Sequence, residues 1–251
     1  MFRPRIIPVL LLKEKALVKS VRFKNHKYIG DPINAVRIFN DLKADELVFL
    51  DIAASENNRL ISLEFVRNVG EEASMPFSVG GGIKSIQDIE SILAAGAEKV
   101  VINTYAGNNP DFIREASDTF GSSTIVVCID VRRELFRGDR AWILNGRRST
   151  HFTPLEFAQL MEQSGAGELI VQSIENDGTM DGYDIELIWS ISTAVNIPVV
   201  ALGGAGKKED LVAAHKNGRA NALAAGSLFV YQDKRRGVLI NYPEKKELCF
   251  E

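Results

Sequence analysis

Cysteine and histidine are scarce in this chain of 251 residues. Its two cysteines, Cys128 and Cys249, provide neither a disulfide framework nor a metal-ligand set, and such cysteine usage fits a reducing cytoplasm. The three histidines, His26, His151 and His215, are scattered without ligand spacing. We therefore expect no metal site and no cofactor.

Long apolar runs and an excess of one charge sign are also missing. The formal net charge is −3, so nothing indicates a surface for nucleic acid. No apolar run approaches the roughly 20 residues that span a bilayer, so we expect no membrane segment. The first residues, MFRPRIIPVLLLK, have a short apolar run and no small-residue cleavage site, which favours a first strand over a signal peptide. A cytoplasmic protein is the expectation.

What the chain does contain is one glycine-rich corner that occurs twice. Residues 76–84 read PFSVGGGIK and residues 196–207 read NIPVVALGGAGK, and a helical pattern follows each. Glycine leaves the backbone N–H groups uncovered, and the next helix adds its positive N-terminal end, so each corner suits a phosphate. A single corner of this kind is equally well read as a tight strand-to-helix connection.

The flanks of the two corners match as well. ELVFLDIAAS (46–55) and KVVINTYA (99–106) surround the first corner, and ELIVQSIEND (168–177) and ALAAGSLFV (222–230) surround the second. One pattern therefore occurs twice, about half a chain apart. This repeat predicts two similar halves with two phosphate sites on one symmetric scaffold.

Short β-type runs alternate with amphipathic segments along the chain. Eight such units predict a (β/α)8 barrel over residues 1–251, whereas the alternative, a doubly wound open sheet, rarely gives eight regular units. Turn residues within 132–151 predict a small hairpin excursion there. The expected strands are Ile6–Leu12, Leu47–Ile52, Phe77–Val79, Val100–Asn103, Thr124–Val131, Leu169–Ser173, Val199–Leu202 and Ala222–Ala225, and the expected helices are Pro32–Leu42, Leu60–Val69, Ile86–Ala94, Asp111–Thr119, Pro154–Gln163, Asp184–Thr193 and Lys208–Lys216.

Two carboxylates end apolar strands, where barrels place their active sites. Asp130 follows TIVVCI and Asp51 closes LVFLD. Partial desolvation at that depth raises the pKa of a carboxyl group and suits it for general acid–base work. A helix cap or an ion pair with Arg132 or Arg133 explains Asp130 equally well, and Asp51 has the same ordinary explanation. Cys128 has the parity of Asp130 and is expected in the barrel core.

A lysine-rich stretch, residues 13–31, follows the first strand and contains Lys19. This composition suits a loop that folds over an anionic ligand, and a mobile solvated loop is the ordinary alternative.

At the opposite ends of the strands, four charges recur at strand starts. Arg5, Glu46, Lys99 and Glu168 begin the first, second, fourth and sixth strands. Two cations and two anions at one level would close a neutral ring across the barrel floor. From the residues alone, four separately solvated charges are the favoured reading.

A family resemblance is carried by PRIIPVLLLK, DELVFLDI, PFSVGGGI, KVVINT, FGSSTIVVCID, GAGELI, DGTMDGYD and ALGGAGK. Together these motifs resemble the cyclase subunit of imidazole glycerol phosphate synthase, from about Met1 to Val230. The resemblance implies a barrel that docks a glutaminase on its lower face as a heterodimer and takes ammonia through its interior. The nitrogen joins a doubly phosphorylated ribulosyl carboxamide aminoimidazole, and ring closure and cleavage give imidazole glycerol phosphate and an aminoimidazole carboxamide ribotide.

The resemblance also implies roles for single residues. Asp130 matches one of two catalytic aspartates, and Glu98 matches an acidic residue that faces the glutaminase. Lys19 and Asp51 join the expected substrate-binding set. The family's ammonia gate matches Arg5, Glu46, Lys99 and Glu168, which reverses the favoured reading above; its phosphate sites match Gly81, Gly82, Asn103 and Thr104 on one side and Asp177, Gly178, Gly203, Gly204, Ala225 and Gly226 on the other.

The chain departs from the family pattern at both ends. The family's first strand ends in Cys-Leu-Asp-Val-Lys, whereas VLLLK here puts Leu11 where the second catalytic aspartate belongs. Losing one proton-transfer group typically costs about 10²–10⁴-fold in rate. Glu14-Lys15 replaces the family's Asp-Gly, and Leu239–Pro243 does not read as its long final helix.

PRIIPVLLLK, with KYIGDPINAVRIFN and LINYP, resembles a side branch of the family. Those paralogues belong to bacterial surface-polysaccharide gene sets and work with a glutaminase and a separate sugar amidotransferase on acetamidino sugars, as in lipopolysaccharide O-antigen. The leading hypothesis is such an ammonia-delivering barrel. The second is a working histidine-pathway cyclase–lyase that uses Asp130 and a replacement acid such as Glu14. The third is a non-catalytic scaffold that activates its glutaminase.

Overall fold

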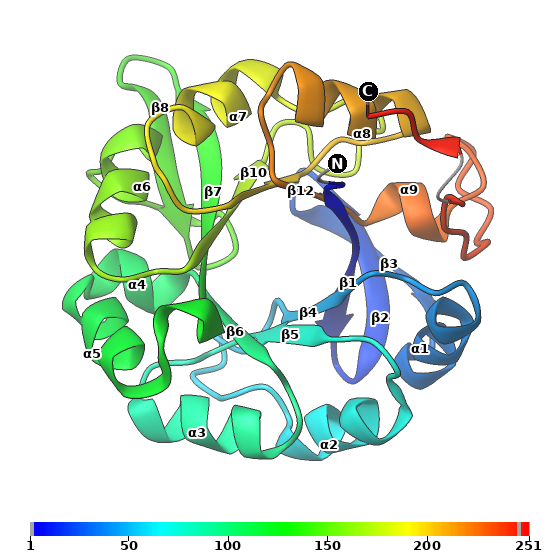
Figure 1. Ribbon diagram of the computed structural model, residues 1–251, viewed down its shortest axis with the longest axis horizontal. Helices are drawn as coiled ribbons and strands as arrows, with labels where there is room; N and C mark the ends of the chain where they lie inside the picture. The colour runs from blue at the N-terminus through cyan, green and yellow to red at the C-terminus, as the bar shows by residue number, and fades with distance from the viewer. Residues whose placement is uncertain (1–2, 245–246, 251) are drawn as a thin grey trace.

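The computed structural model describes residues 3–244 and 247–250, and a closed ring of parallel strands lies at its centre (Figure 1). Each strand is paired in parallel with both of its neighbours, and the last pairs with the first. The (β/α)8 barrel is confirmed. The order around the ring is β1 (Arg5–Lys13), β4 (Leu47–Asp51), β5 (Phe77–Gly80), β6 (Lys99–Ile102), β7 (Ile125–Glu134), β10 (Glu168–Ser173), β11 (Val199–Leu202) and β12 (Ala222–Ala225).

Helices surround the ring (Figure 1), and several of them begin at residues whose side chains cap them. The side chains of Asp31, Ser85 and Thr153 each accept a hydrogen bond from the backbone N–H three residues later. No helix of the described residues has the length and apolar character needed to cross a membrane. The outer helices are α1 (Pro32–Asp41), α2 (Leu63–Glu72), α3 (Ile86–Ala94), α5 (Asp111–Phe120), α6 (Pro154–Gln163), α7 (Ile185–Ser192) and α8 (Lys208–Lys216); α4 (Thr104–Asn108) and α9 (Ser227–Val230) are short.

Two apolar layers hold the barrel together. One layer fills the ring itself, with Val9, Val48, Cys128 and Ile170 among its buried residues. The other layer lies between the strands and the helices. Because parallel strands are buried on both faces, their sequences are near-continuous apolar runs, as in IVVCI.

The lysine-rich stretch after β1 is a β-hairpin, so its prediction as a loop was wrong. Its strands are β2 (Ala16–Val21) and β3 (Lys24–Gly30), and β2 pairs back onto β1. Two-residue turns join the three strands, and both central residues have positive φ in each turn, at Glu14-Lys15 and at Arg22-Phe23. Such turns normally carry Asn or Gly, so the usual turn signal is absent from this sequence.

A second hairpin follows β7 at the barrel mouth. β7 continues to Glu134 and pairs with β8 (Gly138–Ile143), which pairs with the short β9 (Arg148–Ser149). These strands occupy most of the stretch where the excursion at 132–151 was expected. The expected helix from Leu60 begins instead at Leu63, because the Ser62 side chain caps it by accepting a hydrogen bond from the N–H of Phe65.

Candidate functional site

The first glycine corner, Gly80–Gly82, lies at the end of β5. Gly81 and Gly82 have φ values of 142° and 72°. A Cβ on Gly82 would lie 1.8 Å from the Arg59 carbonyl oxygen, so the corner excludes any side chain there. The corner lines a hollow in the barrel mouth, called the first hollow here, together with Asp51, Asn103, Thr104 and Asp130.

The second glycine corner, Gly203-Gly204, ends β11, which is four strands away from β5 around the ring in either direction. The φ values are 92° and 110°, and a Cβ on Gly204 would lie 2.1 Å from the Gly182 carbonyl oxygen. The corner lines the second hollow, together with Lys19, Asp177, Gly178 and Gly226. The two hollows share Leu11, Ser20 and Gln172 and therefore adjoin.

Of the residues predicted to bind phosphate or substrate, Ala225 alone lines neither hollow. It belongs to the apolar layer between strands and helices. The sequence pattern missed Ser20 and Gln172, which donate to the Asp177 carboxylate at 3.0 and 3.2 Å. Gln172 could have been found as a polar residue in the apolar strand ELIVQS, whereas Ser20 lies in the unforeseen hairpin.

Lys19 reaches the second hollow from β2. Its side chain is buried, and its Nζ donates to the Val9 carbonyl oxygen at 2.6 Å. Burial lowers the pKa of Lys19 to about 8, opposed by the nearby Asp177 carboxylate. A Cβ at Gly226 would lie 2.2 Å from the Lys19 Nζ, so this glycine leaves room for the ammonium group. The second hollow therefore has a fixed cation beside Gly226, one of the glycines that line it.

Asp130 is a buried carboxyl group on β7 in the first hollow. Burial raises its pKa to about 7, while a hydrogen bond from the Cys128 thiol, with Sγ 3.5 Å from Oδ1, acts in the opposite direction. Asn103 Nδ2 donates to Oδ2 at 3.3 Å. Near neutral pH the group populates both protonation states, which is the condition for general acid–base work.

An ion pair with arginine was the ordinary explanation for both aspartates, and the structure shows one for Asp51 only among the described residues. The Arg132 guanidinium stacks 4.7 Å from the centre of the Trp142 ring and donates to the Gly146 carbonyl oxygen. Asp51, in contrast, forms an ion pair with Arg59 at 2.6 Å. Asp51 is thus paired with an arginine in the lining of the first hollow, whereas no ion pair joins Asp130 to an arginine among the residues that the structure describes. The Arg132 charge acts on Asp130 at longer range and lowers the pKa that burial raises.

Position 11, where the family pattern has its second aspartate, is an apolar leucine. Leu11 lines both hollows and packs with Leu50 against the apolar layer inside the ring. Glu14, the suggested replacement acid, lies in the exposed turn between β1 and β2 and lines neither hollow. Among the residues that the structure describes, no group of three or more His, Cys, Asp or Glu side chains is placed to hold a metal ion.

Asp130 should make the stability of the protein depend on pH. Its pKa is about 7 in the folded state and close to the ordinary 3.8 when unfolded, so the folded state binds the proton more tightly. The free energy of unfolding should therefore fall as pH rises from about 4 to about 7. Between these pH values the wild type should lose roughly 2–4 kcal/mol of unfolding free energy relative to the Asp130→Asn variant, as measured by urea denaturation. A difference between the two proteins that stays constant with pH would contradict the raised pKa.

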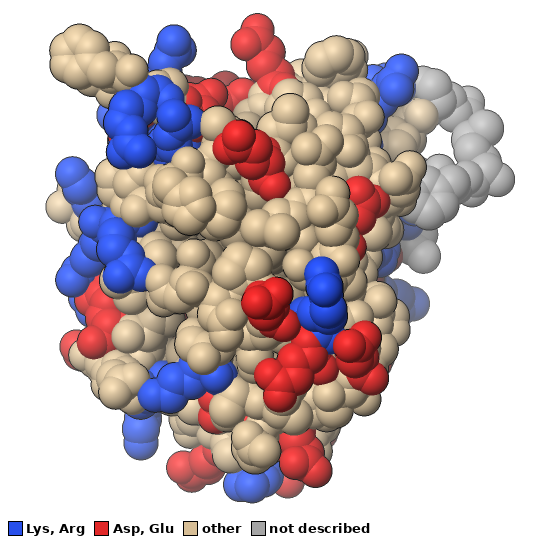
Figure 2. Space-filling view, turned by 90° about the vertical axis from the view of Figure 1, so that its left-hand side faces the viewer, with Lys and Arg blue, Asp and Glu red and all other residues tan. Residues whose placement is uncertain are grey.

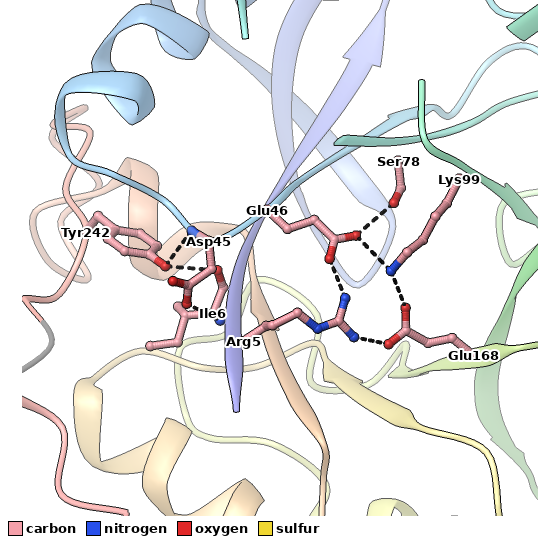
Figure 3. A network of polar contacts seen from close by, with 8 residues as sticks. All are labelled: Arg5, Ile6, Asp45, Glu46, Ser78, Lys99, Glu168 and Tyr242. Atoms are coloured by element: carbon pink, nitrogen blue, oxygen red, sulfur yellow. Dashed lines mark hydrogen bonds and ion pairs between the residues drawn. The ribbon is translucent and has the colours of Figure 1, made fainter. Parts of the chain in front are cut away.

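The barrel floor carries a closed ring of charges, called the floor ring here (Figure 3). Arg5 forms ion pairs with both Glu46 and Glu168, and Lys99 lies 3.5 Å from Glu46 and 3.1 Å from Glu168. Ser78 Oγ donates to Glu46 at 2.8 Å. The two carboxylate side chains are only 4% and 8% exposed. The reading as four separately solvated charges was wrong, and the role of the ring stays a prediction.

Outside the floor ring, Glu98 is exposed immediately before Lys99, and its role at a partner interface stays a prediction. At the other end of the barrel the two hairpins carry mostly cations, and Figure 2 shows blue side chains gathered along its left-hand edge. The exposed cations of these hairpins are Lys15, Arg22, Lys24, Lys27, Arg133, Arg137, Arg147 and Arg148, against exposed Glu14 and Asp139.

Residues 5–235 match the family model of the histidine biosynthesis proteins. The chain belongs to this family. A Pseudomonas aeruginosa protein, provisionally named imidazole glycerol phosphate synthase subunit hisF2, is 46% identical over 248 residues, 99% of each chain. A provisionally named subunit hisF3 of Vibrio vulnificus is 41% identical over 249 residues, 98% of this chain and 95% of that relative. The subunit HisF of Alkaliphilus metalliredigens is 42% identical over 233 residues, 93% of this chain and 92% of that relative.

The chain is therefore a HisF-type member of the histidine biosynthesis proteins, and the similarity spans nearly its whole length. The resemblance to the cyclase subunit of imidazole glycerol phosphate synthase is confirmed at the level of the family. Both glycine corners, Asp130 and the floor ring lie within the matched residues.

Proposed function

We propose that this chain is an ammonia-delivering barrel that takes ammonia from a glutaminase and serves acetamidino-group formation on a bacterial surface-polysaccharide sugar. The observation that carries the proposal is the contrast between the two ends of the barrel. The floor ring is complete, with both carboxylates held by both cations. The first hollow holds the acid–base carboxyl group of Asp130, and the apolar Leu11 stands where the family pattern has its second aspartate.

Delivery through the barrel is consistent with its interior. Between the floor ring and the hollows, the ring of strands is filled with apolar side chains, among them Ile7, Val9 and Val126. An ammonium ion would lose its hydration there without a partner, whereas neutral ammonia crosses such a layer at much lower cost. In this arrangement the glutaminase forms a heterodimer with the floor, near Glu98. The two glycine corners bind a phosphorylated small molecule, and a separate sugar amidotransferase uses the ammonia.

A second function is favoured by Asp130. Its pKa of about 7 suits a working cyclase–lyase of histidine biosynthesis. The Alkaliphilus relative carries the name of that enzyme's subunit without qualification. This candidate needs a replacement for the missing carboxylate, and the exposed turn position of Glu14 does not provide one.

The two functions are separated by a glutaminase-coupled assay with the doubly phosphorylated histidine-pathway substrate. Because one proton-transfer group is missing, we expect turnover about 10²–10⁴-fold below that of a cyclase subunit with both aspartates. Glutamate release measured in the same reactions shows whether the glutaminase is bound and active. Turnover near that of the complete cyclase would contradict the delivery proposal and support the histidine-pathway function.

A further inference from the structure

The pairing of β1 with β4 stops before it reaches the floor. Its register runs from Val9 opposite Val48 upward to Leu12 opposite Asp51. Continued downward, this register places Ile6 opposite Asp45, directly beside Arg5 and Glu46 of the floor ring. The strands are joined at that level by side chains, because the Asp45 carboxylate accepts from the N–H of Ile6 at 3.0 Å.

Tyr242 supplies the other connection at this level (Figure 3). Its hydroxyl accepts from the N–H of Asp45 at 3.0 Å and donates to the carbonyl oxygen of Ile6 at 3.0 Å. One side-chain oxygen thus bridges the two backbones at a level where the strands no longer pair directly. Burial raises the pKa of Tyr242, so the hydroxyl keeps its proton and remains a donor.

The hydroxyl is held in place by the segment that carries it. After α9 the chain runs back along this helix. The N–H of Leu239 donates to the carbonyl oxygen of Val230, and the N–H of Asn241 donates to that of Phe229, both at 3.0 Å. The Tyr242 ring packs on the Phe229 ring with a centroid distance of 5.7 Å. These contacts hold the Tyr242 side chain in one position at the floor of the barrel.

We infer that Tyr242 is a positioning residue for the floor ring. It fixes the backbone of Ile6 and Asp45, and these residues adjoin Arg5 and Glu46, whose side chains form an ion pair. Because Arg5 also holds Glu168, a shift at this point would reach both carboxylates of the ring. The C-terminal segment, which lies outside the repeated barrel pattern, is thus part of the floor. The consequence for ammonia rests on the proposed function, whereas the positioning does not.

Tyr242→Phe tests the positioning in the isolated chain. The variant keeps the ring against Phe229 and loses both hydrogen bonds. We expect amide hydrogen exchange in peptides covering Ile6 and Asp45 to become roughly fivefold faster, the size of one buried hydrogen bond. Tyr231→Phe removes a hydroxyl from the same segment away from the floor and should leave these peptides unchanged. Unchanged exchange in Tyr242→Phe would overturn the inference.

An isotope competition in the complete complex tests the consequence for ammonia. Glutamine labelled with ¹⁵N at its amide is supplied with unlabelled ammonium chloride, and the label in the aminated product is measured. We expect Tyr242→Phe to incorporate severalfold more unlabelled nitrogen than the wild type or Tyr231→Phe. If Tyr242→Phe shows faster amide exchange but keeps the wild-type ¹⁵N content in the product, the effect on ammonia delivery is overturned. Free mixing in the wild type itself would refute the proposed function, and the exchange result would still decide the positioning.

Discussion

Leu11→Asp should increase turnover of the doubly phosphorylated histidine-pathway substrate by about 10²–10⁴-fold. Leu11 lines both hollows, and the first of these also contains the Asp130 carboxyl group. An aspartate there would restore a second proton-transfer group at the mouth of the barrel. Ammonium chloride is the nitrogen source in this measurement, so the result reports on the barrel without a glutaminase.

Leu11→Asn is the matched control for this gain. Asparagine has the shape of aspartate and cannot transfer a proton at neutral pH, so we expect no increase. A wild type that already equals Leu11→Asp would show that the barrel completes its catalysis with another group. An equal gain in the asparagine variant would show that polarity, rather than proton transfer, limits the wild type.

Arg5→Ala should destabilise the protein by about 3 kcal/mol, the low end of the range for breaking a buried ion pair. The substitution leaves the buried Glu46 and Glu168 carboxylates to share Lys99 alone among the cations of the ring. We choose the low end because the Arg5 side chain is 35% exposed, so water screens part of the interaction. Urea unfolding at neutral pH measures the change.

Arg37→Ala provides the comparison for this prediction. Arg37 pairs with Glu72 at 3.0 Å, but its side chain is 59% exposed. Exposed pairs contribute little to stability, so this variant should unfold at nearly the same urea concentration as the wild type. If Arg5→Ala unfolds at the same urea concentration as Arg37→Ala, the floor ring behaves as solvated surface charge.

The sequence was sufficient for the barrel because its signals are periodic. Apolar strands alternate with amphipathic helices, and capping residues such as Asp31 and Ser85 mark where helices begin. The glycine corners were visible for a similar reason, since only glycine avoids the clashes at Gly82 and Gly204. Each of these features is visible as a short run of neighbouring residues, even where the atoms that would clash, on Arg59 and Gly182, lie elsewhere in the chain.

Features that depend on distant contacts were harder to predict. The composition of the stretch after β1 indicates a loop, but Leu17 and Val18 are buried and fix it as a hairpin. The floor ring unites residues from three strands with Glu46, which directly precedes a fourth, and only the family resemblance favoured the ring over separate surface charges. Tyr242 escaped notice because its two partners lie 197 and 236 residues away in the chain, and nothing in LINYP points to them.

The cationic hairpins and the neutral floor make the two ends of the barrel electrically different. A negatively charged small molecule is attracted to the mouth, where exposed lysine and arginine outnumber exposed carboxylates on both hairpins. The floor ring combines two cations with two anions and exerts little net pull on an uncharged molecule. Ionic strength therefore acts unequally on the two ends: added salt slows the arrival of an anion at the mouth and leaves the approach of an uncharged molecule to the floor ring almost unchanged.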